Sequence, residues 1–482
     1  MFLRWNSICD AVLISGASPQ SKRESQVFTA AKSRGFSTEM VENKPYCCTP
    51  FGPQHCDPEG VSMSRSRQDF AVRLCLAIGM AICFYAVARK GMGAWYFQTK
   101  SPQALQGAIR WDPYNAQYYD ALATLRHFYA DNENPNEQVR LYERATSLSP
   151  QNAQYWADLG TAYDWAGNRD DALRALEHGR NLFPNSPEIN WRLANFYVRI
   201  GETEEGLSTL RKVLLGGGVP RQDVFALAES VAPDRETILK DMMPPQASIL
   251  LDYLNYQAIA GDMPAAEQVW GRLLALKLPF ELPECFPYLD ALIQKRETEA
   301  LAGAWSALGE RFPEKVGKLI VSSNMLTNGN FESAILNGGL DWRVVPVEGA
   351  TVGLDSPAKF AGRSVRIEFD GTRNLDYGHL FQYVLVQPNT RYRFSGLMRT
   401  LGITTDSGPR FQLFDAYNPG RGLKETENLV GTSGWAEQQI AFKTPPGTCL
   451  LVVRIARPAS GKFDNKIAGT LWIAQLRLAP EE

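Results

Sequence analysis

Arginine and amide side chains recur at alternating positions in the last third of the chain, and these are the residue types best suited to binding chemistry. The apolar residues between them give a period of two, which predicts that the polar set shares the face of a β-sheet opposite its core. Arginine pairs with carboxylates through two parallel hydrogen bonds, and glutamine binds hydroxyl groups. The set comprises Gln382, Arg393, Ser395, Arg399, Arg410, Gln412 and Arg454.

Aromatic residues lie near this set in predicted loops and at predicted strand ends. Aromatic faces stack on sugar rings while polar side chains fix the hydroxyl groups. Together the two sets predict a glycan-binding cleft that prefers acidic sugars. Its predicted residues are Arg393, Arg399, Arg410, Gln412, Arg454, Trp342, Tyr377 and Trp435, with His379 nearby. The alternative is a solvated sheet face beside tryptophans that belong to the core.

The segment that must position these residues, 322–480, has the pattern of an antiparallel sandwich. Apolar residues alternate over 365–369, 381–385, 411–413 and 451–455, and turns rich in glycine, proline and asparagine separate these runs. Several short strands at this spacing are typical of a β-sandwich or jelly roll.

Four stretches of this segment carry a resemblance to a known family. Residues 324–332 (NMLTNGNFE), 339–342 (GLDW) and 360–367 (FAGRSVRI) resemble the opening of the jelly-roll carbohydrate-binding modules found beside glycoside hydrolases, and 386–394 (VQPNTRYRF) is similar to the strand pair that follows. The resemblance implies a jelly roll that binds polysaccharide. We predict no cofactor, because Gln475 stands where the family often has an aspartate that serves a structural calcium ion.

No catalytic motif accompanies these residues. The sequence lacks GxxxxGK[ST], GxSxG and HExxH, and the cysteines and histidine at 47, 48, 55 and 56 do not have the spacing of a zinc site. We therefore predict no metal site and no enzymatic activity. A glycan-modifying enzyme stays as an alternative, because a glycosidase needs only two carboxylates that meet in space.

Residues 102–316 have helical periodicity, and the pattern repeats. Pro113, Pro150 and Pro184 close successive units, and a glycine-rich break at 216–220 divides clear repeats (102–218) from degenerate ones (219–316). In the clearest unit, 153–186, the first helix carries Trp156, Leu159, Gly160 and Tyr163, and the second carries Ala172, Leu176 and Gly179.

This unit resembles the tetratricopeptide repeat, which implies an α-solenoid of helical hairpins. A single hairpin cannot bury its own apolar face, so several must stack. In the family the first helix of each hairpin lines a groove for a peptide or protein partner. The predicted groove residues on first helices are Tyr118, Tyr119, Tyr155 and Asn190. The alternative is a spacer that holds the next domain away from a membrane.

Residues 70–88 (FAVRLCLAIGMAICFYAVA) form an apolar run flanked by Arg65, Arg67, Arg89 and Lys90. Their length and composition predict a single transmembrane helix. A signal peptide cleaved after the small residues at 86–88, or a buried helix, are the alternatives. Residues 1–69 are predicted to be a disordered leader, with Met63 as an alternative start.

The net charge of −2 gives no basic surface, so we predict no nucleic-acid partner. The predicted fold class is multidomain α + β: a transmembrane helix, an α-solenoid and a β-sandwich. These elements suggest a non-enzymatic scaffold of the bacterial cell envelope, in the inner membrane with its C-terminal part periplasmic. It would bind a protein partner and a polysaccharide, in exopolysaccharide assembly or export. A pure protein-interaction scaffold that binds no sugar is the alternative.

Overall fold

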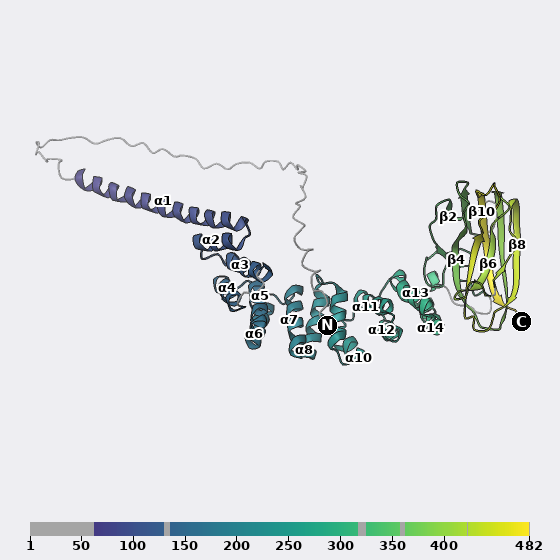
Figure 1. Ribbon diagram of the computed structural model, residues 1–482, viewed down its shortest axis with the longest axis horizontal. Helices are drawn as coiled ribbons and strands as arrows, with labels where there is room; N and C mark the ends of the chain where they lie inside the picture. Colours follow the sequence, from purple (N-terminus) through teal and green to yellow (C-terminus); the bar gives the residue numbers. More distant parts are fainter. Residues whose placement is uncertain (1–61, 130–134, 317–323, 357–361, 422, 482) are drawn as a thin grey trace, which may run out of the picture. The chain divides into compact units, whose positions relative to one another are not determined.

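The computed structural model describes residues 62–129, 135–316, 324–356, 362–421 and 423–481 (Figure 1). Most of the predicted leader, residues 1–61, lies outside the described residues. The chain divides into two compact units, Met1–Met80 and Ala81–Glu482. Helices precede strands along the chain, as the periodicities predict.

The first helix, α1 (Ser62–Gln98), is longer than the predicted transmembrane segment. The predicted leader extended to residue 69, but Ser62–Asp69 is helical and continuous with the apolar run that follows it. In the described part of the chain, Asp69–Gln98 is a helix long and apolar enough to cross a membrane, and no residue of its most apolar stretch is buried. Phe70, Phe84 and Val87 are each at least 70% exposed.

The C-terminal end of α1 belongs to the helical stack. Arg89 Nε donates a hydrogen bond of 2.8 Å to the carbonyl oxygen of Trp111, at the end of α2 (Pro102–Trp111). The rings of Phe97 and Tyr118 lie 5.2 Å apart. The helical stack therefore includes the end of α1. The sequence predicted that the stack begins later, at residue 102.

The following helices pack as consecutive hairpins (Figure 1). They are α3 (Ala116–Tyr129), α4 (Pro135–Leu148), α5 (Ala153–Trp165), α6 (Arg169–Leu182), α7 (Pro187–Ile200), α8 (Thr203–Gly216), α9 (Arg221–Val231), α10 (Arg235–Thr237), a π-helical turn η1 (Ile238–Met242), α11 (Ala247–Ala260), α12 (Met263–Ala275), a 3-10 turn η2 (Leu282–Cys285), α13 (Phe286–Lys295), α14 (Thr298–Arg311) and α15 (Pro313–Val316).

The small residues of the repeat allow the paired helices to approach closely. A Cβ atom on Gly160 of α5 would lie 2.6 Å from Leu176 Cγ on α6. Pro113, Pro150 and Pro184 lie in the turns between hairpins, as predicted. The indole of Trp156 donates a 2.8 Å hydrogen bond to the carbonyl oxygen of Pro150, which ties α5 to the preceding turn.

The glycine-rich break at 216–220 does not interrupt the apolar core. One cluster of buried side chains runs from Ala194 and Leu207, before the break, to Trp270 and Trp305 on the second helices of the last two full hairpins. The degenerate repeats therefore continue the same stack, and their larger side chains replace the small residues of the clear repeats.

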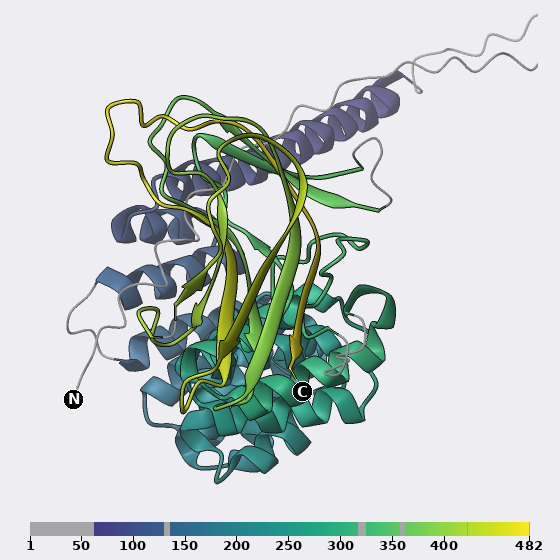
Figure 2. The same ribbon diagram turned by 90° about the vertical axis from the view of Figure 1, so that its right-hand side faces the viewer.

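The C-terminal part consists of two antiparallel five-stranded sheets, in the orders β1-β4-β9-β6-β7 and β2-β3-β10-β5-β8 (Figure 2). We call them sheet A and sheet B. Their strands are β1 (Arg343–Val344), β2 (Ala350–Asp355), β3 (Ser364–Asp370), β4 (Tyr377–Leu385), β5 (Arg391–Ile403), β6 (Arg410–Asp415), β7 (Lys424–Glu425), β8 (Gly431–Lys443), β9 (Leu450–Arg457) and β10 (Ala468–Pro480). The jelly-roll connectivity stays a prediction.

Strand β4 faces the opposite way from the prediction. Gln382, predicted to face solvent, is buried, and its Nε2 donates a 2.8 Å hydrogen bond to the carbonyl oxygen of Thr327. Tyr383 and Leu385, predicted to lie between the sheets, instead pack against the core of the last helices. Both faces of β4 are apolar because one covers the sandwich core and the other contacts helices.

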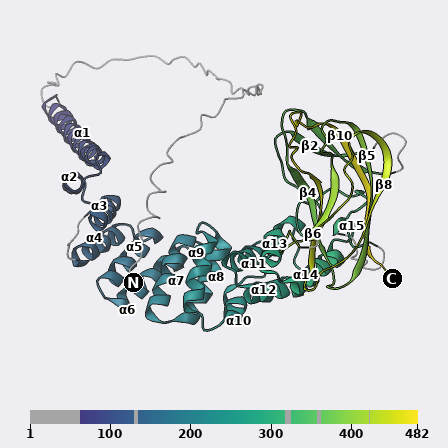
Figure 3. The same cartoon turned by 45° about the vertical axis from the view of Figure 1, so that its right-hand side comes forward.

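The helices and sheet A share a junction at α13 and α14 (Figure 3). Arg343 of β1 forms an ion pair with Asp290 of α13. The guanidinium of Arg296 lies 4.9 Å from the ring centre of Tyr417. Gly339, at φ 56°, lies so close to Trp305 that an added Cβ would be 2.2 Å from the indole ring. These contacts make the junction a packed interface.

Candidate partner-binding groove

The four predicted groove residues mostly serve their own hairpins. Tyr118 is buried against Phe97, and the Tyr119 hydroxyl donates to the carbonyl oxygen of Pro113 at 3.1 Å. Asn190 is buried, and its Nδ2 donates to two carbonyl oxygens in the preceding turn. Tyr155 is half-buried. Three of the four therefore stabilise turns or the core.

A polar cluster crosses the first helices of three clear repeats. Arg192 of α7 pairs with Asp158 of α5 and, at 2.8 Å, with Glu188 one turn away on its own helix. Gln154 Nε2 donates to Glu188 at 3.1 Å. Asp120 of α3 completes the cluster, and one of its carboxylate oxygens is buried with no hydrogen-bond partner in the described part of the chain.

Burial sets the protonation of this cluster. It raises the pKa of Asp120 to about 7, and the neighbouring charge of Asp158 adds to that rise. Burial also raises the pKa of Asp158, although Arg192 opposes the rise. Asp120 is therefore the carboxyl that holds a proton most readily, because Arg192 stabilises the charge on Asp158.

The repeat period could have revealed part of this cluster. Gln154 and Glu188 occupy equal positions in successive repeats, as do Asp158 and Arg192. Residues at equal positions on stacked helices become neighbours, so opposite charges one repeat apart predict an ion pair. Asp120 falls outside this register, because it stands seven residues after Pro113, whereas Asp158 and Arg192 each stand eight residues after Pro150 and Pro184.

A groove with an apolar lining opens between α9 and α11, in the degenerate repeats. Its volume is about 610 Å³. Its lining includes Pro220, Phe225, Tyr256, Ile259 and Ala260, together with the ion pair of Arg221 and Asp252. Ile259 is 80% exposed although it is a large apolar residue on a helix. We call this the apolar groove.

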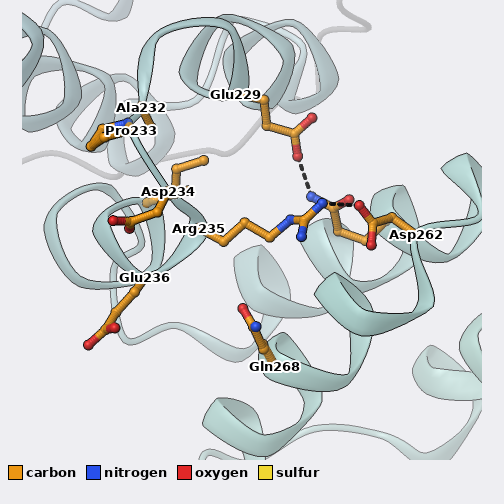
Figure 4. A pocket seen from close by; sticks show the side chains of 10 residues that line it. Glu229, Ala232, Pro233, Asp234, Arg235, Glu236, Asp262 and Gln268 are labelled. Carbon is orange, nitrogen blue, oxygen red and sulfur yellow. Dashed lines mark hydrogen bonds and ion pairs between the residues drawn. The ribbon is translucent and has the colours of Figure 1, made fainter.

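An acidic cavity of about 650 Å³ lies beside the C-terminal ends of α9 and α11, and most of its lining comes from the residues that follow these helices (Figure 4). Its lining carries four carboxylates, Glu229, Asp234, Glu236 and Asp262, and one guanidinium, Arg235. Arg235 forms an ion pair with Asp262, and Glu229 accepts a hydrogen bond from Gln257 (Figure 4). We call this the acidic cavity.

Aromatic residues join the groove to the cavity. Phe225 packs against Tyr253 and Tyr256, with ring centres 4.9 and 5.6 Å apart. The hydroxyls of Tyr253 and Tyr256 donate to the two carboxylate oxygens of Glu229, at 3.1 and 3.4 Å. Tyr256 thus lines the apolar groove and touches a wall of the acidic cavity.

The surface formed by the apolar groove and the acidic cavity was not predicted from the sequence. A signal for it is present in α11, because the apolar residues Tyr256 and Ile259 lie off the buried face of this helix. The buried residues of α11 are Ile249, Leu250, Leu251, Tyr253, Leu254, Gln257 and Ala258. Apolar side chains off the core face of a helix mark a contact site when they cluster, and here Phe225 and Pro220 of the neighbouring helix join them.

The predicted glycan-binding residues are divided between the two sheets. Trp342 and Tyr377 are buried in the sandwich core and offer no free ring face. Arg393, Arg399 and Trp435 belong to sheet B, where Arg393 pairs with Glu481 and Arg399 lies 4.9 Å over the ring of Trp472. Arg410, Gln412 and Arg454 belong to sheet A.

The sheet A residues form one hydrogen-bonded row. Arg454 Nε donates to Gln412 Oε1 at 2.9 Å, and Gln412 Nε2 donates to Glu425 Oε2 at 2.9 Å. Arg410 pairs with the other oxygen of Glu425 at 3.3 Å. The guanidinium of Arg454 lies 4.9 Å from the ring centre of Phe414. Arg410 thus pairs with the carboxylate directly, whereas Arg454 is linked to it through Gln412.

Among the described residues, no group of three or more His, Cys, Asp or Glu side chains could hold a metal ion. Gln475 lies at a β-bulge between β10 and β5, with φ 51°. The backbone next to it is occupied, because the carbonyl oxygen of Leu476 accepts a 2.9 Å hydrogen bond from Asn324 Nδ2.

Comparison with known proteins finds tetratricopeptide-type relatives. No family model matches the chain. Over 86 residues it is 32% identical to a TPR repeat-containing thioredoxin of Arabidopsis thaliana, a match covering 18% of this chain and only 12% of that protein. The helical hairpins are therefore tetratricopeptide-like, as the sequence predicts.

Several solved structures each resemble part of the chain. The structure of YrrB, a TPR protein with an unusual peptide-binding site, matches 44% of this chain and 95% of its own, with 14% identity and a TM-score of 0.23. MamA matches 34% of this chain and 96% of its own, with 19% identity and a TM-score of 0.24. A structure described as CBM4 matches 32% of this chain and 99% of its own, with 13% identity and a TM-score of 0.25.

Proposed function

We propose that this protein is a non-enzymatic, membrane-anchored scaffold whose tetratricopeptide-like hairpins bind a segment of a protein partner. The observation that carries the proposal is the apolar groove between α9 and α11. Its apolar lining, with Ile259 80% exposed, is the kind of concave, partly apolar surface on which partners dock. The exposed apolar stretch of α1 supports the anchor.

Photo-crosslinking in cells tests the scaffold function. p-Benzoylphenylalanine replaces Ile259 in the full chain, and a second variant carries it in place of Leu215, an exposed apolar residue of α8. We expect a discrete protein adduct at position 259 and none of that mass at position 215. Equal, diffuse labelling at both positions would contradict a partner site in the groove.

A glycan-binding sandwich is a second candidate function. The observation that favours it is the row of Arg410, Gln412 and Arg454, which is predicted from the sequence and lies on one sheet. Arg410 Nε is buried without a partner among the described residues, so an acidic sugar could supply one. Because Glu425 already neutralises part of the row, the sugar would compete with it for the guanidinium groups.

Retention on an acidic polysaccharide tests the second candidate. Arg410→Ala in the full chain should weaken salt-sensitive retention, while Arg366→Ala, which removes an arginine of β3 in sheet B, should leave it unchanged. Equal retention of both variants would remove the row as a sugar site. A polysaccharide ligand would also favour the periplasmic side of the inner membrane and a role in exopolysaccharide assembly or export.

A further inference from the structure

We propose that the surface joining the apolar groove to the acidic cavity binds an extended protein segment in which an apolar side chain stands close to a lysine or arginine. This inference rests on the proposed scaffold function and specifies the chemistry of its partner. Each half includes residues of α9 and α11, Phe225 and Tyr256 in the groove and Glu229 and Gln257 in the cavity, so one bound segment would reach both halves.

The apolar half selects the first side chain. Ile259 and Tyr256 present apolar surface beside Phe225, whose ring is buried beneath them. The polar groups at the edge of the groove, Arg221 and Asp252, already neutralise each other as an ion pair. An apolar side chain of the partner would remove exposed surface from water without leaving a charge unpaired.

The acidic half selects the second side chain. Arg235 offsets only one of the four carboxylates. The hydrogen bonds that Glu229 accepts in the described part of the chain come from the neutral donors Tyr253, Tyr256 and Gln257, which do not offset the charge of a carboxylate. The backbone N–H of Thr237 donates to Asp234 and lowers the pKa of that carboxyl. The cavity is therefore negative at neutral pH.

Charge complementarity decides between possible occupants. A lysine or arginine side chain would pair with the carboxylates, whereas an acidic segment would be repelled at short range. Tyr256 lies at the boundary, because its ring lines the groove while its hydroxyl donates to Glu229 at 3.4 Å. The apolar and cationic side chains of the partner should therefore be near neighbours in sequence.

A defined peptide panel tests this inference on the full chain purified in detergent. The probes are fluorescent peptides of equal length. In three of them leucine is followed closely by lysine, by glutamate or by serine, and a fourth has serine and lysine without leucine. Binding is measured by fluorescence anisotropy at low and high salt. We expect the leucine–lysine peptides to bind most tightly and to weaken as salt rises.

Two substitutions on exposed residues then separate the halves of the surface. Ile259→Asp should weaken the leucine–lysine peptide by about tenfold, and Glu236→Lys should weaken it by a similar factor and abolish its salt dependence. The matched controls are Leu215→Asp and Glu204→Lys on α8, which should leave binding unchanged.

The outcomes distinguish failure of the inference from failure of the scaffold function. If leucine–glutamate or leucine–serine peptides bind equally well, or if Ile259→Asp and Glu236→Lys have no effect, the inference is wrong. A crosslinked partner at position 259 would then still support the scaffold function. If no peptide binds and no crosslinked adduct forms, both are wrong.

Discussion

At the scale of single residues, the carboxyl pair of Asp120 and Asp158 couples the stability of the clear repeats to pH. The folded pKa of Asp120 is about 7, against 3.8 for an ordinary aspartate. Between these values the folded chain holds a proton that the unfolded chain has released, so this carboxyl lowers stability as pH rises through the window. The contribution of Asp120 to the free energy of unfolding is most favourable below the unfolded pKa of 3.8, where the carboxyl is protonated in both states.

Asp120→Asn should remove this dependence. We expect the variant to match the natural chain near about pH 4 and to exceed it by on the order of 1 kcal/mol in free energy of unfolding near about pH 8. Urea denaturation followed by helical circular dichroism measures the difference at each pH. Asp171→Asn, on the exposed side of α6, is the control. A constant difference across the range would contradict a raised pKa of Asp120 in the folded chain.

Glycines of the repeats divide into those that permit close packing and those that do not. A Cβ atom on Gly160 would lie 3.0 Å from the backbone nitrogen of Leu176, whereas one on Gly271 meets nothing within 4 Å. Gly160→Ala should therefore destabilise the chain by about 1–3 kcal/mol through overpacking. Gly271→Ala should stabilise it by about 0.5–1 kcal/mol through helix propensity.

Thermal unfolding of the two alanine variants measures this contrast. The sign of the change is the informative quantity, because both substitutions add the same methyl group to a helix. If Gly160→Ala were neutral, α5 and α6 would have to separate without loss of contacts, which would argue against the tight hairpin.

At the scale of elements, the sequence predicted where helices and strands lie better than it predicted which faces they bury. The two-residue period of β4 is clear, but the prediction assumed that each sheet has only one buried face. That assumption assigned the faces of β4 wrongly, because Tyr383 and Leu385 pack against helices. The end of α1 was also missed, since its contacts with α2 and α3 depend on residues such as Tyr118 that no local pattern connects to Phe97.

The same limit applies to the candidate sites. Alternation correctly placed Arg410, Gln412 and Arg454 on one sheet, but it could not show that Arg393 and Arg399 belong to the other. The α9–α11 surface is formed by degenerate repeats whose signature residues have been replaced, so a repeat pattern directs attention away from it. Side-chain neighbours across elements decide such sites, and they are encoded by packing over the whole molecule.

The junction between α13 and sheet A should behave as an element of stability in its own right. Asp290→Ala leaves the half-buried guanidinium of Arg343 with two partners among the described residues, the carbonyl oxygen of Gly339 at 3.1 Å and the ring of Tyr383, whose centre is 5.4 Å away. We expect a loss of about 1–3 kcal/mol of local stability, because a charged donor loses its acceptor away from bulk water.

Hydrogen exchange locates that loss. Amides of α13 and β4 should exchange faster in Asp290→Ala, while those of α5 and α6 should keep their rates. Asp171→Ala, which removes an exposed ion pair within α6, is the matched control and should change little. Faster exchange spread evenly over the chain would show that the junction is not a separate unit.

At the scale of the whole molecule, the proposed scaffold requires that the apolar part of α1 lie in a membrane. Leu76 and Ile82 are each 62% exposed on this helix. Arginine near the centre of a spanning helix costs about 2.5–3.5 kcal/mol by insertion scales. Leu76→Arg with Ile82→Arg should therefore move the chain from the carbonate-washed membrane fraction to the soluble fraction.

The control for that release replaces exposed apolar residues of the repeats, Phe183→Arg with Leu215→Arg, and should leave the chain in the membrane fraction.

Intact mass of the mature protein separates anchoring from cleavage. A signal peptide cut after Ala88 would yield a soluble chain beginning at Arg89, which keeps the Arg89–Trp111 hydrogen bond and the Phe97–Tyr118 contact. If α1 is retained and the arginine variant leaves the membrane fraction, α1 is a membrane anchor. If the mature chain starts at Arg89, the protein is a secreted scaffold instead.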